Sequence, residues 1–187
     1  MFRKLNITEL DRLSVDEFKV SQKMPLVVVL DDVRSMYNVG SIFRTSDAYR
    51  VECIYLCGIT GQPPHPEIHK TALGAEDSVD WLYFNSCEQA VDDLLKRGYK
   101  VFAVEQAEDS ITFPLPLDQM NEADGDIPSG YAIVLGNEVK GVRQEVIDRC
   151  DACIELPQFG TKHSLNVSTA AGIVIWEFWK EIHPADN

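Results

Sequence analysis

Leu26-Val27-Val28-Val29-Leu30 opens a segment in which an apolar run, a polar turn and a helical pattern follow one another. The run is β-branched and hardly alternates with polar residues, which is typical of a strand buried on both faces of a parallel sheet. A polar stretch at 31–41 comes next, and the residues from Ile42 to Arg50 have a helical pattern. This order predicts a βα unit, whose turn at the carboxyl end of the strand is where α/β sheets bind ligands.

The alternation of strands and helices continues along the chain. Further strands are predicted at 53–57, 79–84, 100–104, 131–135 and 153–156, and helices at 71–75, from Asn85 or Ser86 to Arg97, and at 142–149 and 164–182. Segment 58–70 is predicted to be a long loop and 105–130 to be connecting loops. We expect an α/β fold with a mainly parallel sheet and helices on both faces. The length suits one domain over 1–187, with 1–24 as a short helical N-terminal extension.

Composition argues against several classes of protein. A hydrophobic fraction of 45% and a charged fraction of 25% are ordinary globular values. No apolar run reaches the roughly 20 residues that span a bilayer, and the first residues lack the apolar core of a signal peptide. We expect a soluble cytoplasmic protein. The five cysteines favour reduced core thiols, and Cys53 and Cys57 are too far apart on a strand to share a zinc, so we expect no metal site.

The formal net charge of −13 at first argues against a nucleic-acid partner. Its distribution weakens that argument. Residues 76–126 hold 13 of the 30 acidic residues and 3 of the 17 basic ones, a net charge of −10. The rest of the chain, with 17 acidic and 14 basic residues, has a net charge of −3, so a local basic site is compatible with the composition.

Three polar, glycine-containing loops follow strand-like runs, and we expect them to meet at one crevice. They are Asn38-Val39-Gly40 with Arg44, Gly136-Asn137-Glu138 with Gly141, and Gly160 through Asn166. No GxGxxG follows the first strand and no GxxxxGK[ST] occurs, so ordinary dinucleotide and P-loop nucleotide binding are poorly supported. Simpler roles stay open on the residues alone. Asn38, Ser164 and Asn166 could cap helices, and Glu138 could be a solvated acid beside Lys140.

These stretches carry a family resemblance. Residues 38–45, Asn-Val-Gly-Ser-Ile-Phe-Arg-Thr, resemble the first motif of the SpoU (TrmH-type) RNA ribose 2′-O-methyltransferases of the SPOUT superfamily. Residues 133–142, Ile-Val-Leu-Gly-Asn-Glu-Val-Lys-Gly-Val, resemble the second motif, and residues 156–168 resemble the third. The motifs occur in the family's order, and the resemblance covers about residues 26–180.

The resemblance implies a fold and partners that periodicity does not show. It implies a C-terminal trefoil (α/β) knot, which is a rare exception to ordinary chain topology. It also implies a homodimer whose active site combines both subunits, and S-adenosylmethionine as the cofactor. The residues expected to bind that cofactor are Val104, Glu105, Gly136, Leu156, Gly160 and Leu165.

The resemblance further assigns roles in methyl transfer to a ribose 2′-hydroxyl, with tRNA as the first candidate substrate and rRNA as the second. The expected catalytic residues are Arg44, Asn38, Glu138, Ser164 and Asn166, and the expected RNA contacts are Arg34, Lys140 and Lys162. A guanidinium holds its proton tightly, so Arg44 is better suited to fixing an RNA phosphate than to acting as a free base. The competing hypothesis is a non-catalytic RNA-binding or ribosome-assembly protein with the same fold, motivated by the acidic balance.

Overall fold

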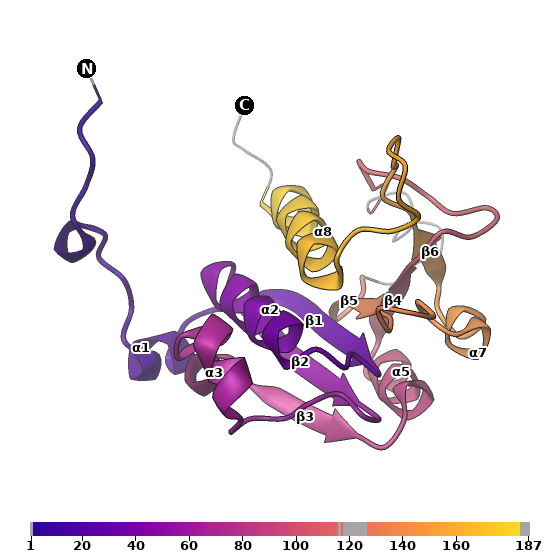
Figure 1. Cartoon of the computed structure of the whole chain (residues 1–187), viewed down its shortest axis with the longest axis horizontal. Helices are drawn as coiled ribbons and strands as arrows, with labels where there is room; N and C mark the ends of the chain where they lie inside the picture. The colour runs from indigo at the N-terminus through magenta and orange to yellow at the C-terminus, as the bar shows by residue number, and fades with distance from the viewer. Residues whose placement is uncertain (1, 116, 118–126, 184–187) are drawn as a thin grey trace.

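The computed structural model describes residues 2–115, 117 and 127–183, and a parallel β-sheet forms its centre (Figure 1). Six strands lie in the order β3-β2-β1-β5-β4-β6, and all five pairings between neighbours are parallel. The strands are β1 (Met24–Asp31), β2 (Val51–Cys57), β3 (Trp81–Phe84), β4 (Tyr99–Val104), β5 (Gly130–Leu135) and β6 (Ala152–Ile154). The predicted parallel sheet is therefore confirmed.

Helices cover both faces of this sheet because alternate strand residues point to opposite sides. Leu26, Val28 and Leu30 of β1 pack in one core with α2 (Met36–Ala48), α3 (Pro66–Ala72) and α8 (Val167–Ile182). Val27 and Val29 pack in the other core with α5 (Cys87–Lys96) and α7 (Gln144–Ile147). The unalternating apolar pattern of β1 thus has the predicted cause, which is burial on both faces.

The helix after β1 begins earlier than predicted. We expected a polar turn through Ser41, but α2 starts at Met36, because the Ser35 side chain accepts a hydrogen bond from the Asn38 N–H and caps the helix. The first motif therefore lies on a helix rather than in a loop. Asn38 therefore does not cap this helix, and its side chain can make other contacts.

The region predicted as a long loop at 58–70 also contains a helix. α3 begins at Pro66, whose missing N–H is harmless at the first helical position, and the His65 side chain accepts from the Glu67 N–H. The short helix predicted at 71–75 is wrong in its bounds. α3 ends at Ala72, Leu73 and Gly74 take positive φ angles, and α4 (Ala75–Ser78) follows.

The remaining helices depart from their predicted bounds in smaller ways. α5 has the predicted Ser86 cap, and Gly98 follows it with φ +78. α7 is shorter than the predicted 142–149, and α8 begins at Val167 rather than Ser164. The N-terminal region holds η1 (Ile7–Glu9) and α1 (Val15–Val20), as short as predicted. Part of the predicted loop 105–130 lies outside the described residues, and the trefoil knot stays a prediction.

In the described part of the chain, no helix combines the length and apolar character needed to cross a membrane.

Candidate active site

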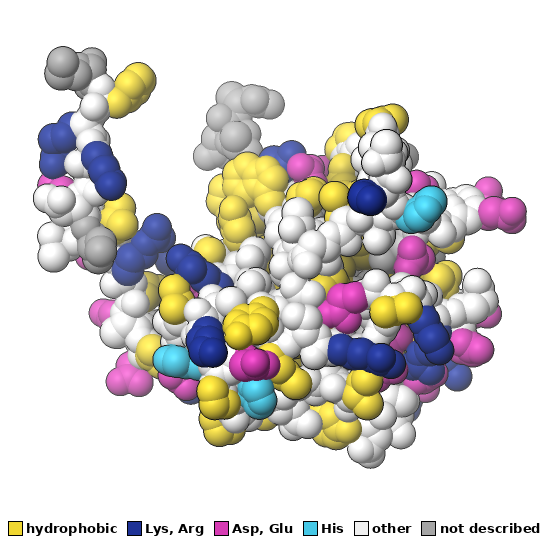
Figure 2. Space-filling view, in the orientation of Figure 1, with side chains coloured by type: hydrophobic (Ala, Val, Ile, Leu, Met, Phe, Trp, Pro, Cys, Tyr) yellow, Lys and Arg dark blue, Asp and Glu magenta, His cyan; other side chains and the backbone are white. Residues whose placement is uncertain are grey.

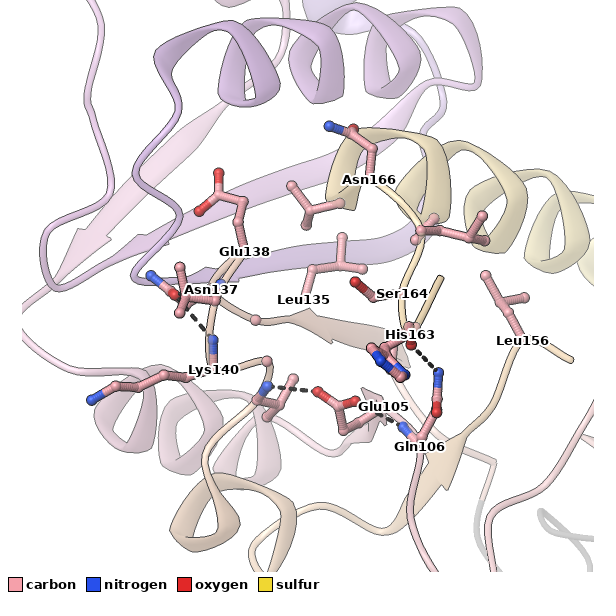
Figure 3. A pocket seen from close by; sticks show the side chains of 18 of the residues that line it. Glu105, Gln106, Leu135, Asn137, Glu138, Lys140, Leu156, His163, Ser164 and Asn166 are labelled. Carbon is pink, nitrogen blue, oxygen red and sulfur yellow. Dashed lines mark hydrogen bonds between the residues drawn. The ribbon is translucent and has the colours of Figure 1, made fainter. Parts of the chain in front are cut away.

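A cavity of about 640 Å³ opens at the carboxyl ends of β4 and β5, where parallel sheets bind ligands. Its walls come from the end of β4, from the loop between β5 and α7, and from the segment between β6 and α8 (Figure 3). The lining residues are Val104, Glu105, Gln106, Leu135, Gly136, Asn137, Glu138, Val139, Lys140, Gly141, Val142, Gln144, Ile147, Leu156, Gln158, His163, Ser164, Leu165, Asn166, Val167 and Ala170. The second and third motifs therefore meet, as the resemblance implied.

The loop after β5 is folded tightly on itself. The backbone groups of Asn137 and Gly141 exchange two hydrogen bonds, of 2.8 and 3.2 Å. Asn137 Nδ2 donates to the Asp32 carbonyl at 2.8 Å, which fastens the loop to the end of β1. A Cβ on Gly136 would lie 2.1 Å from the Gly141 carbonyl carbon, so no side chain fits there without displacing the loop.

Glu105 fastens the same loop to the end of β4. Its Oε2 accepts from the Val142 N–H at 2.9 Å, and its Oε1 accepts from the Gln106 N–H at 2.9 Å. Gly141 has φ +66, and a Cβ there would lie 1.9 Å from Glu105 Oε2. Gln106 Nε2 in turn donates to the His163 carbonyl at 2.9 Å. The end of β4 thus holds both the second and the third motif loops.

Asn38, Glu138 and Asn166 form a hydrogen-bonded chain beside the cavity. Glu138 Oε1 accepts from Asn38 Nδ2 at 3.0 Å, and Asn166 Nδ2 donates to Asn38 Oδ1 at 3.2 Å. Asn166 Oδ1 also accepts from the N–H groups of Ser168 and Thr169, so this residue caps α8 and joins the site at once. Each of the three motifs thus contributes one residue to this hydrogen-bonded series.

Glu138 is held as a carboxylate acceptor. Besides Asn38, the N–H groups of Arg34 and Ser35 donate to it at 3.2 and 3.1 Å. Desolvation raises the pKa of Glu138, but hydrogen bonds from its own backbone, from Asn38 and from the other two N–H groups together hold that pKa below its ordinary value. Glu138 is therefore a charged anchor for the first turn of α2.

Arg44 is not brought into the cavity. It lies on α2, six residues after Asn38, with an exposed side chain. It is absent from the lining, and it has no hydrogen bond or ion pair to another residue within the described part of the chain. A catalytic role for Arg44 therefore requires a reacting group that lies outside the walls of this cavity.

The other predicted site residues divide in the same way. Glu138, Ser164 and Asn166 line the cavity, as do Val104, Glu105, Gly136, Leu156, Leu165 and Lys140. Gly160 and Lys162 lie on the segment between Gln158 and His163 but outside the lining, and Arg34 reaches the site through its backbone N–H, which donates to Glu138. All of their functional roles stay predictions.

Among the lining residues that were not predicted, Asn137 and Gln106 fasten the loops of the cavity to neighbouring segments. Asn137 lies within the second motif, and Gln106 lies two residues after the end of β4. An amide at such a position is a signal for loop anchoring, because it can donate and accept at once.

The cavity combines apolar and polar walls. Leu135, Leu156 and Leu165 contribute apolar surface, and the second and third motif loops line much of the rest. Apolar surface of this kind suits a flat ring, and the volume is in the range of small-molecule sites. Among the described residues, no group of three or more His, Cys, Asp or Glu side chains is arranged to hold a metal ion.

Comparisons with known proteins agree with this arrangement. The chain is 30% identical over 158 residues to a tRNA (guanosine(18)-2′-O)-methyltransferase of Aquifex aeolicus, covering 81% of this chain and 67% of the relative. It is 28% identical over 153 residues to a 23S rRNA (guanosine-2′-O-)-methyltransferase of Neisseria meningitidis, covering 82% of this chain and 57% of the relative. The structure of an AdoMet-bound rRNA methyltransferase from Sinorhizobium meliloti is similar, with a TM-score of 0.75, 27% identity, and coverage of 86% of this chain and 57% of that one.

The chain spans 57 to 65% of the length of several curated relatives that it matches. The family profile itself, that of the SpoU rRNA methylase family, matches residues 25–176, which run from β1 into α8. With that match over most of its length, and with the three motifs gathered at one end of a parallel sheet, the chain belongs to the SpoU rRNA methylase family.

Proposed function

We propose that this protein is an S-adenosylmethionine-dependent RNA methyltransferase that methylates a ribose 2′-hydroxyl. The observation that carries the proposal is the contact of Asn38, Glu138 and Asn166, one from each motif, beside a cavity suited to an adenosyl group. The named activities of the Aquifex and Neisseria relatives support the ribose 2′-hydroxyl as the acceptor, with tRNA first and rRNA second. The proposed unit is one cytoplasmic domain over 1–187, with 1–24 as its N-terminal extension.

The residues of the cavity would hold the cofactor and position the RNA. S-adenosylmethionine, when bound, supplies the methyl group. Leu135, Leu156 and Leu165 offer apolar surface for its adenine, and the peptide groups of the motif loops offer hydrogen bonds. Because displacement at a methyl group needs little covalent help, the protein contributes mainly by orienting the reactants.

Arg44 is proposed to fix an RNA phosphate next to the target ribose. Its guanidinium can contact phosphate through two parallel hydrogen bonds. Glu138 is proposed as a positioning residue, because its carboxylate already accepts from Asn38 and from the N–H groups of Arg34 and Ser35. It is poorly placed to take the proton of the hydroxyl.

We also propose a homodimer in which Arg44 acts at the partner's cavity. Two observations support it. Arg44 is exposed and lies outside the cavity of its own chain. Apolar side chains gather over α8 (Figure 2), where Trp176 is 40% exposed, stacks on Trp179 at 5.2 Å and contacts Tyr49 of α2 at 5.8 Å. An exposed aromatic cluster of this kind is typical of an interface.

The first test is calorimetry with S-adenosylmethionine, followed by transfer of a labelled methyl group to tRNA and to rRNA. We expect Arg44→Ala to lose transfer by 10²-fold or more while cofactor affinity is unchanged. Arg149→Ala is the matched control, because Arg149 is an exposed arginine paired only with Asp92 of α5. If S-adenosylmethionine at millimolar concentration does not bind, the methyltransferase proposal is refuted and a non-catalytic RNA-binding protein is favoured.

A further inference from the structure

α2 presents a strip of three side chains to the outside. Tyr37, Ser41 and Arg44 are spaced i, i+4 and i+7, so they lie on one side of the helix. Tyr37 is 44% exposed, and Arg44 is exposed. α2 lies between α3 and α8, with contacts to both (Figure 1). The strip is therefore bordered on each side by another helix.

α3 brings a lysine to this strip. Gly40 allows the close approach, because a Cβ there would lie 2.2 Å from the Ile68 carbonyl oxygen and 2.2 Å from Thr71 Oγ1. Thr71 Oγ1 donates to the Tyr37 carbonyl at 2.9 Å, which fixes the two helices together. As a result, Lys70 Nζ lies over the Tyr37 ring, 5.9 Å from its centroid.

The strip begins next to the candidate active site. Tyr37 directly precedes Asn38, whose side chain contacts Glu138 and Asn166 at the rim of the cavity. The strip thus extends outward from the hydrogen-bonded residues of the site. It presents the exposed ring of Tyr37, Lys70 above that ring, and Arg44 two helical turns further along. Two acids near α2 are engaged, since Glu138 accepts from α2 and its cap, and Glu76 is paired with His69, whereas Glu67 on α3 is exposed.

We propose that this strip, Tyr37, Ser41 and Arg44 together with Lys70, binds a single-stranded nucleotide of the substrate RNA. Tyr37 stacks on its base, while Lys70 and Arg44 contact phosphates on either side. This assignment rests on the proposed function, and it adds that the substrate is unstacked RNA rather than a regular duplex. Stacking on an aromatic ring accepts any base, and proteins read unpaired RNA mainly in this way.

The test uses a fluorescent single-stranded RNA of mixed sequence, with affinity measured by anisotropy without cofactor at several salt concentrations. We expect Tyr37→Ala to weaken binding about tenfold or more at every salt concentration. Lys70→Ala should instead lower the slope of log affinity against log salt by about 0.7, because one phosphate contact is lost. Tyr37→Phe, which keeps the ring, should restore the affinity lost in Tyr37→Ala.

Matched controls lie away from the strip, on the edge strand β3 and on α5, which covers the opposite face of the sheet. Tyr83→Ala removes a ring that is 42% exposed on edge strand β3, and Lys96→Ala removes an exposed lysine on α5. Both should bind RNA as the unaltered protein does. Circular dichroism of Tyr37→Ala confirms that it is folded before its affinity is interpreted.

Two results would overturn the inference. One is an affinity of Tyr37→Ala within twofold of the unaltered protein. The other is a change of Tyr37→Ala from dimer to monomer, which would place a second copy on the strip. If RNA binding depends on Tyr37 but no methyl group is transferred, the proposed function alone is refuted. If methyl transfer is the same in Tyr37→Ala as in the unaltered protein, this inference alone is refuted.

Discussion

Glu138 shows how single residues organise the site. Its carboxylate connects the loop after β5 to the first turn of α2, 100 residues earlier in the chain, through Asn38 and the N–H groups of Arg34 and Ser35. An uncharged amide would present one oxygen and one NH₂ group to these three donors. At least one N–H would then face a donor and lose its partner.

We therefore expect Glu138→Gln to lower the free energy of unfolding, and the size of the loss to depend on pH. The pKa of Glu138 is lowered in the folded protein, so its carboxylate stabilises the fold above the unfolded-state pKa of about 4.5. That contribution is lost as pH falls through the lower folded-state pKa. Urea unfolding at a series of pH values should show a constant difference near neutral pH that shrinks below about 4.5.

Glu108→Gln is the control for this measurement, because the side chain of Glu108 is exposed. The difference between this variant and the unaltered protein should stay small throughout the pH series. A Glu138→Gln difference that does not change with pH would contradict the anchoring role of the carboxylate.

At the scale of single residues, the sequence predicted the members of the site better than it predicted their contacts. The motifs pointed to Asn38, Glu138 and Asn166, but the contacts of Asn38 span 100 and 128 residues of chain, and no local pattern encodes them. Nothing in the protein lies within 4 Å of the Cβ that Gly160 lacks, so its predicted role in cofactor binding stays a prediction. Asn137 was passed over because its anchoring partner, the Asp32 carbonyl, is remote in sequence.

Among the elements, the strands followed the sequence closely and the helix ends did not. Runs such as Leu26 to Leu30 carry their own signal, since burial on both faces needs apolar residues throughout. The starts of α2 and α3 depend on single capping side chains, Ser35 and His65, inside stretches otherwise rich in turn formers. When local preferences compete in this way, the hydrophobic pattern alone does not predict where a helix starts.

Gly40 tests the contact between α2 and α3. We expect Gly40→Ala to cost about 1–3 kcal/mol in the free energy of unfolding, because the new methyl group overpacks against Ile68 and Thr71. Gly172→Ala in α8 should instead stabilise by about 0.5–1 kcal/mol, since nothing lies within 4 Å and alanine favours a helix. Thermal or urea unfolding of both variants measures the contrast, and equal effects would refute the close approach.

Gly141 tests the loop after β5. Its positive φ and the carboxylate of Glu105 leave no place for a side chain. We expect Gly141→Ala to displace the loop and weaken S-adenosylmethionine binding about tenfold or more, as measured by calorimetry. Gly172→Ala, on α8 and outside the lining of the cavity, should bind the cofactor normally because its surroundings are open. Unchanged affinity in Gly141→Ala would mean that this loop does not hold the cofactor.

At the scale of the whole molecule, acidic residues lie on both faces of the sheet. The acidic segment 76–126 includes β3, α5 and β4, and it also includes Glu76 and Asp77 of α4, which packs with α2. The helices α2, α3 and α8 carry three basic residues, Arg44, Lys70 and Lys180, and four acidic ones, Asp47, Glu67, Glu177 and Glu181. RNA binding by a chain with a net charge of −13 therefore depends on the local contacts of Arg44 and Lys70, which the charge distribution of the sequence could not show.

The proposed dimer gives a prediction at this scale. Trp176→Glu places a charge in the exposed cluster of α8, so light scattering should show a monomer, and methyl transfer should fall about 10²-fold or more because Arg44 loses its partner cavity. Leu82→Glu, at a 49% exposed position on β3, should remain a dimer. A Trp176→Glu protein with the mass of the unaltered one would place the interface elsewhere.

Mixed dimers test whether the site is shared. When one chain carries Arg44→Ala and the other Gly141→Ala, a site built from both chains leaves one intact pairing, and methyl transfer should recover. A site complete within one chain leaves none, and the mixture should be as inactive as either variant alone.

The capping of α8 by Asn166 has a consequence for synthesis on the ribosome. Asn166 reaches Asn38 only after 128 further residues have been made, and the cavity is walled by the segment just before it. β1, β2 and β3 can pair earlier, since they follow one another along the chain. The pocket therefore matures last, and a nascent chain that lacks α8 can have most of its sheet without yet being able to hold a ligand.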